Sequence, residues 1–290
     1  MARIIPPSEL IINEDGSIFH LHVKPEWLAD TVLLMGDPAR VTMTASFFDS
    51  IEIDVQSREF HTITGMYHGK RISCVSHGIG TDNIDIVLTE LDALKNIDFA
   101  TRTVKPVFTP LTLIRIGTSG GMQDFCPVGS FVVSRRSIGF DGVLNFYADT
   151  ERVRDLDFEA VFGRHTGFDT SHGTPYCAVN DTELLSRIAG VDMVIGNTIA
   201  SSGFYGPQGR RLRLPLQDEQ LNSKIESFSY NGECITNYEM ESSALAGLAG
   251  MLGHKALTVC LIIANRVGKR FIGDYKPKMR ERMATGLDRI

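Results

Sequence analysis

Short apolar runs rich in β-branched residues alternate with amphipathic stretches along the chain from Thr31 onward. Alternation of this kind predicts strands that form a central sheet and helices that cover it. Six runs bounded by glycine or polar turns predict strands at 31–35, 71–77, 111–117, 130–138, 193–200 and 256–264. Apolar residues at helical spacing predict a helix over 84–94 and, less regularly, one over 240–252.

The chain has no stretch with the composition of an interdomain linker and no internal repeat. Its 290 residues, 43% hydrophobic and 22% charged, are ordinary for a protein with one large α/β domain. We therefore expect a single domain over residues 1–290, with residues 1–18 as an N-terminal arm and residues 98–110 as a long loop.

The net charge of −6 and the pI near 5.8 argue against nucleic acid or an anionic membrane surface as a partner. The most apolar run, 256–264, is too short to span a bilayer, and the N-terminus lacks an apolar segment of signal-peptide length. The cysteines are odd in number, scattered and without a CxxC pair, so we expect reduced, buried thiols in a cytoplasmic protein. They are Cys74, Cys126, Cys177, Cys234 and Cys260.

Several predicted strands end in glycine-rich turns, and in open α/β sheets ligands collect at such carboxyl ends. In GDPAR, at 36–40, backbone N–H groups and the fork of Arg40 could bind the oxygens of a phosphate. Gly-Asp-Pro is also the composition of an ordinary type I turn, and that reading is favoured for this segment alone.

In RIGTSGG, at 115–121, the charged Arg115 interrupts an apolar strand. A guanidinium there is costly unless it faces a polar cavity or pairs with a carboxylate such as Asp37 or Glu241. The hydroxyls and glycines that follow it tip the balance slightly toward an anion site.

The loop FYGPQGR, at 204–210, combines the aromatic face of Phe204, the amide of Gln208 and the guanidinium of Arg210. A flat polar ring such as uracil presents two carbonyl acceptors with an N–H donor between them. Gln208 offers both an acceptor and donors, and Arg210 adds donors. The alternative is a surface turn with an incidental glutamine and arginine.

NYEMESSAL, at 237–245, places Glu239 and Glu241 near the start of the second predicted helix. The helix dipole alone would favour carboxylates there, but a carboxylate can also accept hydrogen bonds from the two vicinal hydroxyls of a ribose. Spacing does not separate these readings.

Other motifs are missing or incomplete. His20 and His22 form an HxH pair without a third ligand at a recognisable offset, and His77 stands alone in VSHGIG, so we expect no metal. The chain has no GxGxxG fingerprint, Walker loop or GxSxG elbow, which removes the sequence basis for a dinucleotide, ATP or serine-hydrolase reading.

Taken together and in this order, GDPAR, RIGTSGG, FYGPQGR and NYEMESSAL resemble the nucleoside phosphorylase family, and specifically the uridine phosphorylases. The resemblance extends from about residue 19 to residue 266. It implies a partly barrel-like, central mixed sheet flanked by helices. It also implies reversible phosphorolysis of uridine to uracil and ribose 1-phosphate in pyrimidine salvage, with deoxyuridine as a further candidate, phosphate as co-substrate and no cofactor.

The resemblance also implies roles for individual residues. Phosphate would be held by Gly36, Arg40, Arg115 and Thr118, and the ribose by Glu239, Met240 and Glu241. The base would be held by Ser119, Gly120, Phe204, Gln208, Arg210 and Arg266. Arg58 and His20 would reach the phosphate and the ribose 5′ hydroxyl of a neighbouring subunit, so a homodimer would be the smallest competent unit of a dimer or larger homo-oligomer. Arg40, Arg115 and Thr118 would position phosphate for catalysis, while Gln208 and Arg210 would stabilise the departing base.

One position bears on substrate class. Relatives that cleave purine nucleosides carry an aspartate near the end of the last core strand, where this chain reads IANR and has Arg266. Arg266 cannot protonate a purine but could steady Arg210 or a bridging water, so the resemblance favours uracil. The turn Thr81-Asp82-Asn83 departs from the proline and serine of many relatives. The alternatives are a hydrolase of the same fold, a phosphorylase for another nucleoside and a non-catalytic nucleoside sensor.

Overall fold

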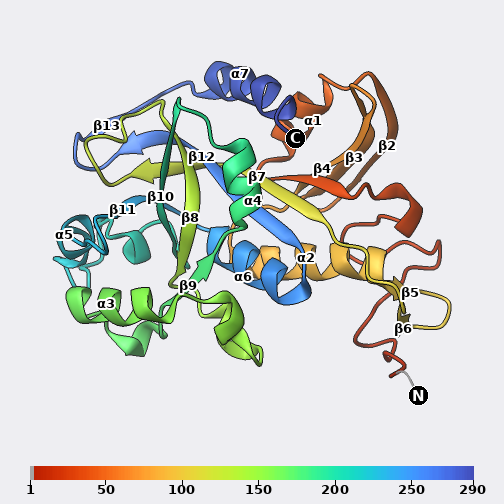
Figure 1. The fold of residues 1–290 in the computed structure, drawn as a ribbon, viewed down its shortest axis with the longest axis horizontal. Coiled ribbons are helices and arrows are strands. Elements are labelled where there is room, and N and C mark those ends of the chain that lie inside the picture. The colour runs from red at the N-terminus through yellow and green to blue at the C-terminus, as the bar shows by residue number, and fades with distance from the viewer. Residues whose placement is uncertain (1–2) are drawn as a thin grey trace.

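The computed structural model describes residues 3–290 and is shown in Figure 1. Eleven strands form one sheet, and a separate two-stranded hairpin lies apart from it. The strands of the sheet are β1 (Thr31–Met35), β2 (Ser50–Ser57), β3 (Phe60–Tyr67), β4 (Lys70–Ser76), β7 (Thr112–Gly121), β8 (Phe131–Gly139), β9 (Tyr176–Val179), β10 (Met193–Ala200), β11 (Ile235–Glu239), β12 (Lys255–Asn265) and β13 (Arg270–Phe271). The helices are α1 (Pro38–Ala45), α2 (Thr81–Asn96), α3 (Leu156–Thr166), α4 (Thr182–Ile188), α5 (Leu221–Glu226), α6 (Ser242–Leu252) and α7 (Lys276–Leu287).

Part of this sheet closes into a ring. Strands β12, β8, β10, β11 and β7 pair in that order, and β7 pairs again with β12 to complete the circuit. An open branch continues from β7 through β1, β4, β3 and β2. Pairing is mixed, because β1 runs parallel to both β4 and β7 whereas β11 runs antiparallel to β7. The expected mixed, partly barrel-like sheet is confirmed.

Helices cover the sheet with apolar faces. Leu88 and Leu91 of α2 and Leu245 and Leu248 of α6 belong to one buried cluster, and these two helices lie side by side in Figure 1. Met279 and Met283 of α7 are buried in a second cluster with Val41 of α1. Burying these faces supplies the main stabilising term of the fold.

The six predicted strands and the two predicted helices are confirmed, with small shifts at their ends. Five further strands of the sheet, β2, β3, β9, β11 and β13, were not predicted. The expected loop over 98–110 was partly wrong, because β5 (Ile97–Asp98) and β6 (Thr103–Val104) form the hairpin. The expected turn at 81–83 is the first turn of α2. The cysteines are free, but Cys234 is only partly buried.

Two more observations concern the sequence-based expectations. No helix in the described part of the chain is long and apolar enough to cross a membrane. Within residues 3–290, no group of three or more His, Cys, Asp or Glu side chains could hold a metal ion. Residues 1 and 2 of the expected N-terminal arm lie outside the described residues.

Candidate active site

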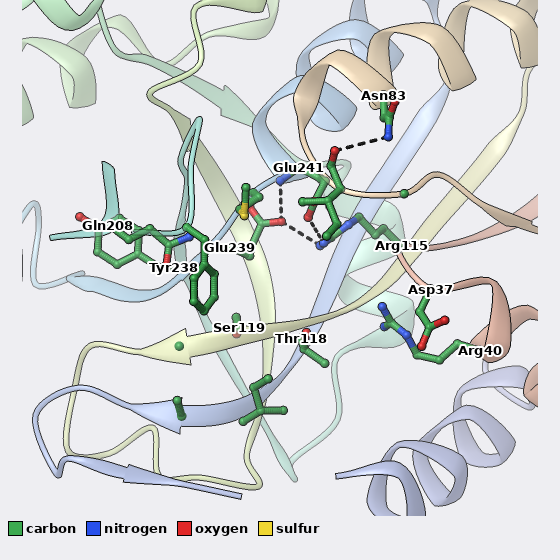
Figure 2. Close-up of a pocket in the computed structure, with 18 of the residues that line it drawn as sticks. Asp37, Arg40, Asn83, Arg115, Thr118, Ser119, Gln208, Tyr238, Glu239 and Glu241 are labelled. Atoms are coloured by element: carbon green, nitrogen blue, oxygen red, sulfur yellow. Dashed lines mark hydrogen bonds and ion pairs between the residues drawn. The ribbon is translucent and has the colours of Figure 1, made fainter. Parts of the chain in front are cut away.

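A cavity of about 720 Å³ opens where the carboxyl ends of β1, β4 and β7 meet the loop 204–210 and the β11–α6 junction. Figure 2 shows Arg40 and Arg115 toward one end of it and Gln208 and Tyr238 toward the other. Every residue predicted to bind substrate lines this cavity except His20, Arg58 and Arg266. Segments far apart in the sequence therefore converge as expected.

Arg40 is a buried cation without a carboxylate partner. The Asp37 side chain accepts a hydrogen bond from the Ala39 N–H at 2.9 Å and caps α1, which places Arg40 in the first turn of the helix. Arg40 is only 7% exposed, and its Nη1 donates to the Ile116 carbonyl at 3.0 Å. Its buried Nε has no hydrogen-bond partner, and no described carboxylate lies within 4.0 Å of the guanidinium.

Burial lowers the pKa of Arg40, and the neighbouring Arg115 lowers it further. The guanidinium nevertheless stays charged at neutral pH. A buried, uncompensated cation at a cavity wall favours an anionic ligand, because such a ligand supplies the missing opposite charge. The turn that GDPAR suggested is the start of a helix, and it still brings Arg40 to the cavity.

Arg115 is paired with carboxylates. Its Nη1 lies 2.8 Å from Glu239 Oε2, and its Nη2 contacts Glu241 Oε2. Burial disfavours the charged form of Arg115, but Glu241 and Glu239 more than offset it and raise its pKa. The pairing with Glu241 considered above is thus present, whereas Asp37 takes no part in it. Arg115 still lines the cavity.

Glu239 holds the β11–α6 junction together. Its carboxylate accepts hydrogen bonds from the N–H groups of Glu241 and Ser242 at 2.9 and 3.0 Å and from the Ser242 hydroxyl at 2.6 Å. Burial raises the pKa of Glu239, and Arg115 opposes that shift. Glu239 itself ends strand β11, but its carboxylate binds the N–H groups of Glu241 and Ser242 at the start of α6, so the helix-dipole interpretation fits its position.

Glu241 connects three elements. Its Oε1 accepts a hydrogen bond from the Gly80 N–H at 2.8 Å, and its Oε2 meets Arg115. It is the N-cap residue of α6 and a cavity-lining side chain together with Met240. Fewer groups surround its carboxylate than that of Glu239, so Glu241 is the freer of the two to accept a ligand hydroxyl.

At the other end of the cavity, Gln208 accepts hydrogen bonds from two arginines. Its Oε1 accepts from Arg210 Nη1 at 2.5 Å and from Arg266 Nη2 at 2.9 Å, and its backbone carbonyl accepts from Arg266 Nη1. Both lone pairs of Oε1 are engaged, so the amide presents Nε2 as its free hydrogen-bonding group. Arg266 thus contacts the same amide oxygen as Arg210, and the expectation that it steadies Arg210 or a bridging water stays a prediction.

Aromatic rings support both arginines. The Arg210 guanidinium lies 3.7 Å from the centre of the Phe204 ring, and that of Arg266 lies 4.8 Å from the Tyr238 ring. Burial lowers the pKa of Arg266 to about 10, with Arg210 adding to the effect. The pKa of Arg210 is also lowered, again chiefly by burial. The carboxylates that line the cavity are Asp37, Glu59, Glu239 and Glu241, and no described aspartate or glutamate forms an ion pair or hydrogen bond with Gln208, Arg210 or Arg266.

His20 and Arg58 lie away from the cavity of their own chain. His20 Nδ1 is 2.6 Å from Glu90 Oε1, and the side chain is 26% exposed. Arg58, exposed in the turn between β2 and β3, rests its guanidinium 5.6 Å from the Phe19 ring. Neither lines the cavity of its own chain, and their service to a neighbouring subunit stays a prediction.

Some cavity residues were not predicted. Tyr238 stands within NYEMESSAL and packs under Arg266. Glu59 follows Arg58, Ile79 lies in VSHGIG and Asn83 in the turn 81–83, but no role was predicted for these three residues. His77 is fully buried next to this wall, and neither of its ring nitrogens has a hydrogen-bond partner. The sequence shows that His77 follows a strand, but it does not show that this side chain is buried near the charges of Arg115 and Arg40.

Comparison with known proteins agrees with this geometry. Residues 30–289 match the phosphorylase superfamily. The chain is 30% identical to uridine phosphorylase of Thermococcus kodakarensis over 89% of its length and 81% of that protein. It is 26% identical to purine nucleoside phosphorylase DeoD-type 1 of Aliivibrio fischeri over 93% of its length and 96% of that protein.

A solved nucleoside phosphorylase of Trypanosoma brucei, described as showing uridine phosphorylase activity, superimposes with a TM-score of 0.88. It is 31% identical, and the match covers 97% of this chain and 98% of that one. The similarity spans nearly the whole chain and includes the elements that build the cavity. This protein belongs to the phosphorylase superfamily and is an enzyme of the nucleoside phosphorylase class.

Proposed function

We propose that the enzyme cleaves uridine with phosphate to give uracil and ribose 1-phosphate. The observation that carries this proposal is the base end of the cavity, where Gln208 is held by Arg210 and Arg266 and none of the described carboxylates contacts these three residues to offer a hydrogen bond to a purine N7. Uracil offers two carbonyl oxygens that suit the amide donor of Gln208 and the guanidinium of Arg210.

Base binding would rearrange one contact. Arg210 would exchange its hydrogen bond to Gln208 Oε1 for one to uracil O4, and the released lone pair of Oε1 would accept the uracil N3–H. Gln208 Nε2 would donate to O2, and Phe204 would pack against the ring. Arg266 would keep the amide in this orientation through its 2.9 Å contact with Oε1.

Phosphate would bind at the other end, against Arg40, Arg115, Thr118 and the backbone at Gly36, and would supply the charge that Arg40 lacks. Glu241 would accept hydrogen bonds from the ribose hydroxyls. As the C1′–N1 bond breaks, its electron pair leaves with the base and a phosphate oxygen bonds to C1′. The uracil anion then takes a proton from solvent. Catalysis consists of placing phosphate beneath C1′ and stabilising the charge on the base.

We further propose a homodimer in which His20 and Arg58 complete the partner's site. The free thiols fit a cytoplasmic enzyme. Mixing inactive Arg40→Ala and Arg58→Ala subunits tests the shared site, because a hybrid dimer has one site with both arginines intact. About a quarter of wild-type activity should return after random reassociation. No recovery, or full activity of a monomer in sedimentation, would contradict the shared site.

The substrate is tested by incubating the enzyme with uridine, deoxyuridine, thymidine and inosine, with and without phosphate, and separating the products. We expect phosphate-dependent release of uracil and ribose 1-phosphate. Preferred cleavage of inosine would contradict the proposed preference for uracil. Inosine is included because the chain is similar to a purine nucleoside phosphorylase. Free ribose without phosphate would indicate a hydrolase, and binding without turnover a sensor.

A further inference from the structure

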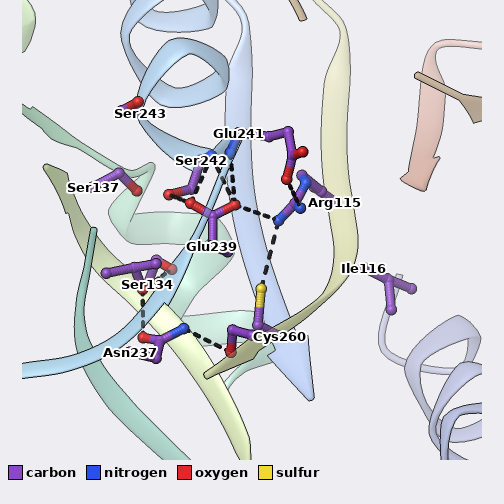
Figure 3. Close-up of polar contacts among 12 residues, drawn as sticks. Arg115, Ile116, Ser134, Ser137, Asn237, Glu239, Glu241, Ser242, Ser243 and Cys260 are labelled. Carbon is purple, nitrogen blue, oxygen red and sulfur yellow. Dashed lines mark hydrogen bonds and ion pairs between the residues drawn. The ribbon is translucent and has the colours of Figure 1, made fainter. Parts of the chain in front are cut away.

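A chain of buried hydroxyl and amide groups ends at the cavity. Figure 3 shows part of it, around Asn237 and Ser134. Ser134 Oγ lies 2.7 Å from Thr198 Oγ1, which donates to Asn237 Oδ1 at 2.9 Å, and Asn237 Nδ2 donates to Ser119 Oγ at 2.9 Å. All four side chains are buried, and Ser119 lines the cavity.

The direction of each hydrogen bond follows from the orientation of the Asn237 amide, whose Oδ1 faces Thr198 and Thr236 and whose Nδ2 faces Ser119. Thr198 gives its single proton to Asn237, so Ser134 must donate to Thr198. Thr236 Oγ1 lies 2.9 Å from the same Asn237 oxygen and 3.0 Å from the Asn197 carbonyl, so its proton is shared between two acceptors. The Asn237 side-chain oxygen therefore faces the hydroxyls of Thr198 and Thr236, and the Asn237 amide N–H points to Ser119.

Ser119 is thus an acceptor toward Asn237, and its own proton has no acceptor among the described residues of the chain. Its place on β7 lies between Thr118, expected at the phosphate, and Gly120, expected at the base. A buried polar chain of this kind contributes little net stability compared with apolar side chains of the same shape, but it fixes the direction of its last donor.

We propose that Ser119 is a catalytic residue whose hydroxyl donates a hydrogen bond to the base as the C1′–N1 bond breaks, and that Asn237 is the positioning residue that fixes this direction. The proposal rests on the proposed function. Ser119 keeps its proton throughout, and the uracil anion is protonated by solvent. A donor fixed before the reaction stabilises developing charge without reorganising during it.

The first test removes the donor. Ser119→Ala should lower kcat on uridine by about 10²-fold. The loss should be several-fold smaller on 5-fluorouridine, because its base departs more readily and needs less stabilisation. The matched control is Ser137→Ala, since Ser137 is buried and accepts from Asn180 Nδ2 at the same 2.9 Å but does not line the cavity. Equal losses on the two substrates, or wild-type kcat in Ser119→Ala, would overturn the proposal.

The second test reverses the hydrogen bond. In Asn237→Asp a carboxylate has no N–H to offer, so Ser119 must turn its proton toward it and away from the base. Burial among neutral groups raises the pKa of such a carboxyl, and the protonated acid can still donate to Ser119. Turnover relative to wild type should therefore fall as pH rises. A variant with wild-type kcat and pH profile would show that Ser119 donates to Asn237 instead, which overturns the assignment.

Failure of the proposed function gives a different result. Wild-type enzyme is assayed first on uridine and inosine with phosphate. If only inosine is cleaved, the uracil preference is wrong, and the same variants are compared on inosine and 7-methylinosine, whose base also departs more readily. If Ser119 donates to the base, Ser119→Ala should lose less kcat on the substrate with the better leaving group, whether the base is a pyrimidine or a purine. Thermal unfolding of each variant verifies that it is folded.

Discussion

Arg40 and Arg115 at one end of the cavity project from a helix and a strand, whereas Gln208 and Arg210 at the other end project from a loop. The first pair is buried and held by backbone, capping and carboxylate contacts that exist without ligand. At the second end Gln208 is buried but Phe204 is 49% exposed, and the two arginines are held by the Gln208 amide, by two backbone carbonyls of the loop and by aromatic faces. Rigid elements therefore present the proposed anion site, and a loop presents the proposed base site.

This difference assigns the common chemical step to one end of the cavity and the choice of base to the other. A site on regular elements keeps its geometry while the sequence of a loop changes, so one phosphate end can serve enzymes with different bases. The similarity of this chain to both uridine and purine nucleoside phosphorylases fits that division. Substitutions at the two ends should accordingly have different effects, and the following experiments test this from the largest expected effect to the smallest.

Arg115→Met should damage both the fold and the activity. It leaves Glu239 and Glu241 buried without their cation, and breaking a buried ion pair from one side typically costs about 3–5 kcal/mol. We expect a clearly lower unfolding midpoint in urea and loss of phosphorolysis. A variant as stable as wild type would show that the carboxylates do not depend on Arg115.

Arg40→Met should damage activity alone. Arg40 has no carboxylate partner to leave behind, so the unfolding midpoint should stay level or rise, while kcat/KM for phosphate falls by about 10²–10³-fold. Steady-state kinetics at varied phosphate, together with urea unfolding, separates the two quantities. Near-normal use of phosphate by this variant would remove the basis for an anion site at this end.

Arg210→Ala should lower kcat on uridine by about 10²-fold without affecting stability, because it removes one donor from a half-exposed loop. Arg266→Lys should have a smaller effect, since Arg266 acts through Gln208 and a lysine can keep one of its contacts. Unchanged phosphorolysis in Arg210→Ala would refute its role.

The smallest effect concerns His77 and pH. Burial, with Arg115 and Arg40, lowers the pKa of His77 well below 6.5, so the folded protein holds it neutral. The unfolded chain binds a proton there below about pH 6.5, so the free energy of unfolding falls as pH falls, by at most about 1.4 kcal/mol per pH unit. Urea unfolding from about pH 5 to 7.5 should show a smaller slope for His77→Phe than for wild type. Equal slopes would mean that His77 is protonated in the folded state.

The sequence predicted structure best where the burial of apolar side chains produces both the sequence pattern and the element. The β-branched runs at 31–35 and 256–264 are buried in the sheet, and the helical spacing from Ile84 to Leu94 reflects the buried face of α2. Strand β11 was not predicted because its sequence, ITNYE, buries polar side chains. Asn237 accepts a hydrogen bond from Thr236 and donates one to Ser119, so these residues do not show the alternation of apolar and polar positions that marks a strand. A pattern of apolar residues cannot reveal a strand of that kind.

The composition of the cavity was predicted better than its contacts. Motifs brought Arg40, Arg115, Gln208 and Arg210 together correctly, but no spacing reveals that Arg115 pairs with two carboxylates or that Arg266 holds Gln208. These contacts join residues more than fifty positions apart, and they depend on the register of β7 with β12 and β11.

The division of the cavity into an anion end and a base end is tested most directly by a crystal structure with phosphate and a non-cleavable uridine analogue. We predict the phosphate within hydrogen-bonding distance of Arg40 and Thr118 and the pyrimidine edge against Gln208 and Arg210. A phosphate bound away from Arg40, or a base turned away from Gln208, would contradict the account.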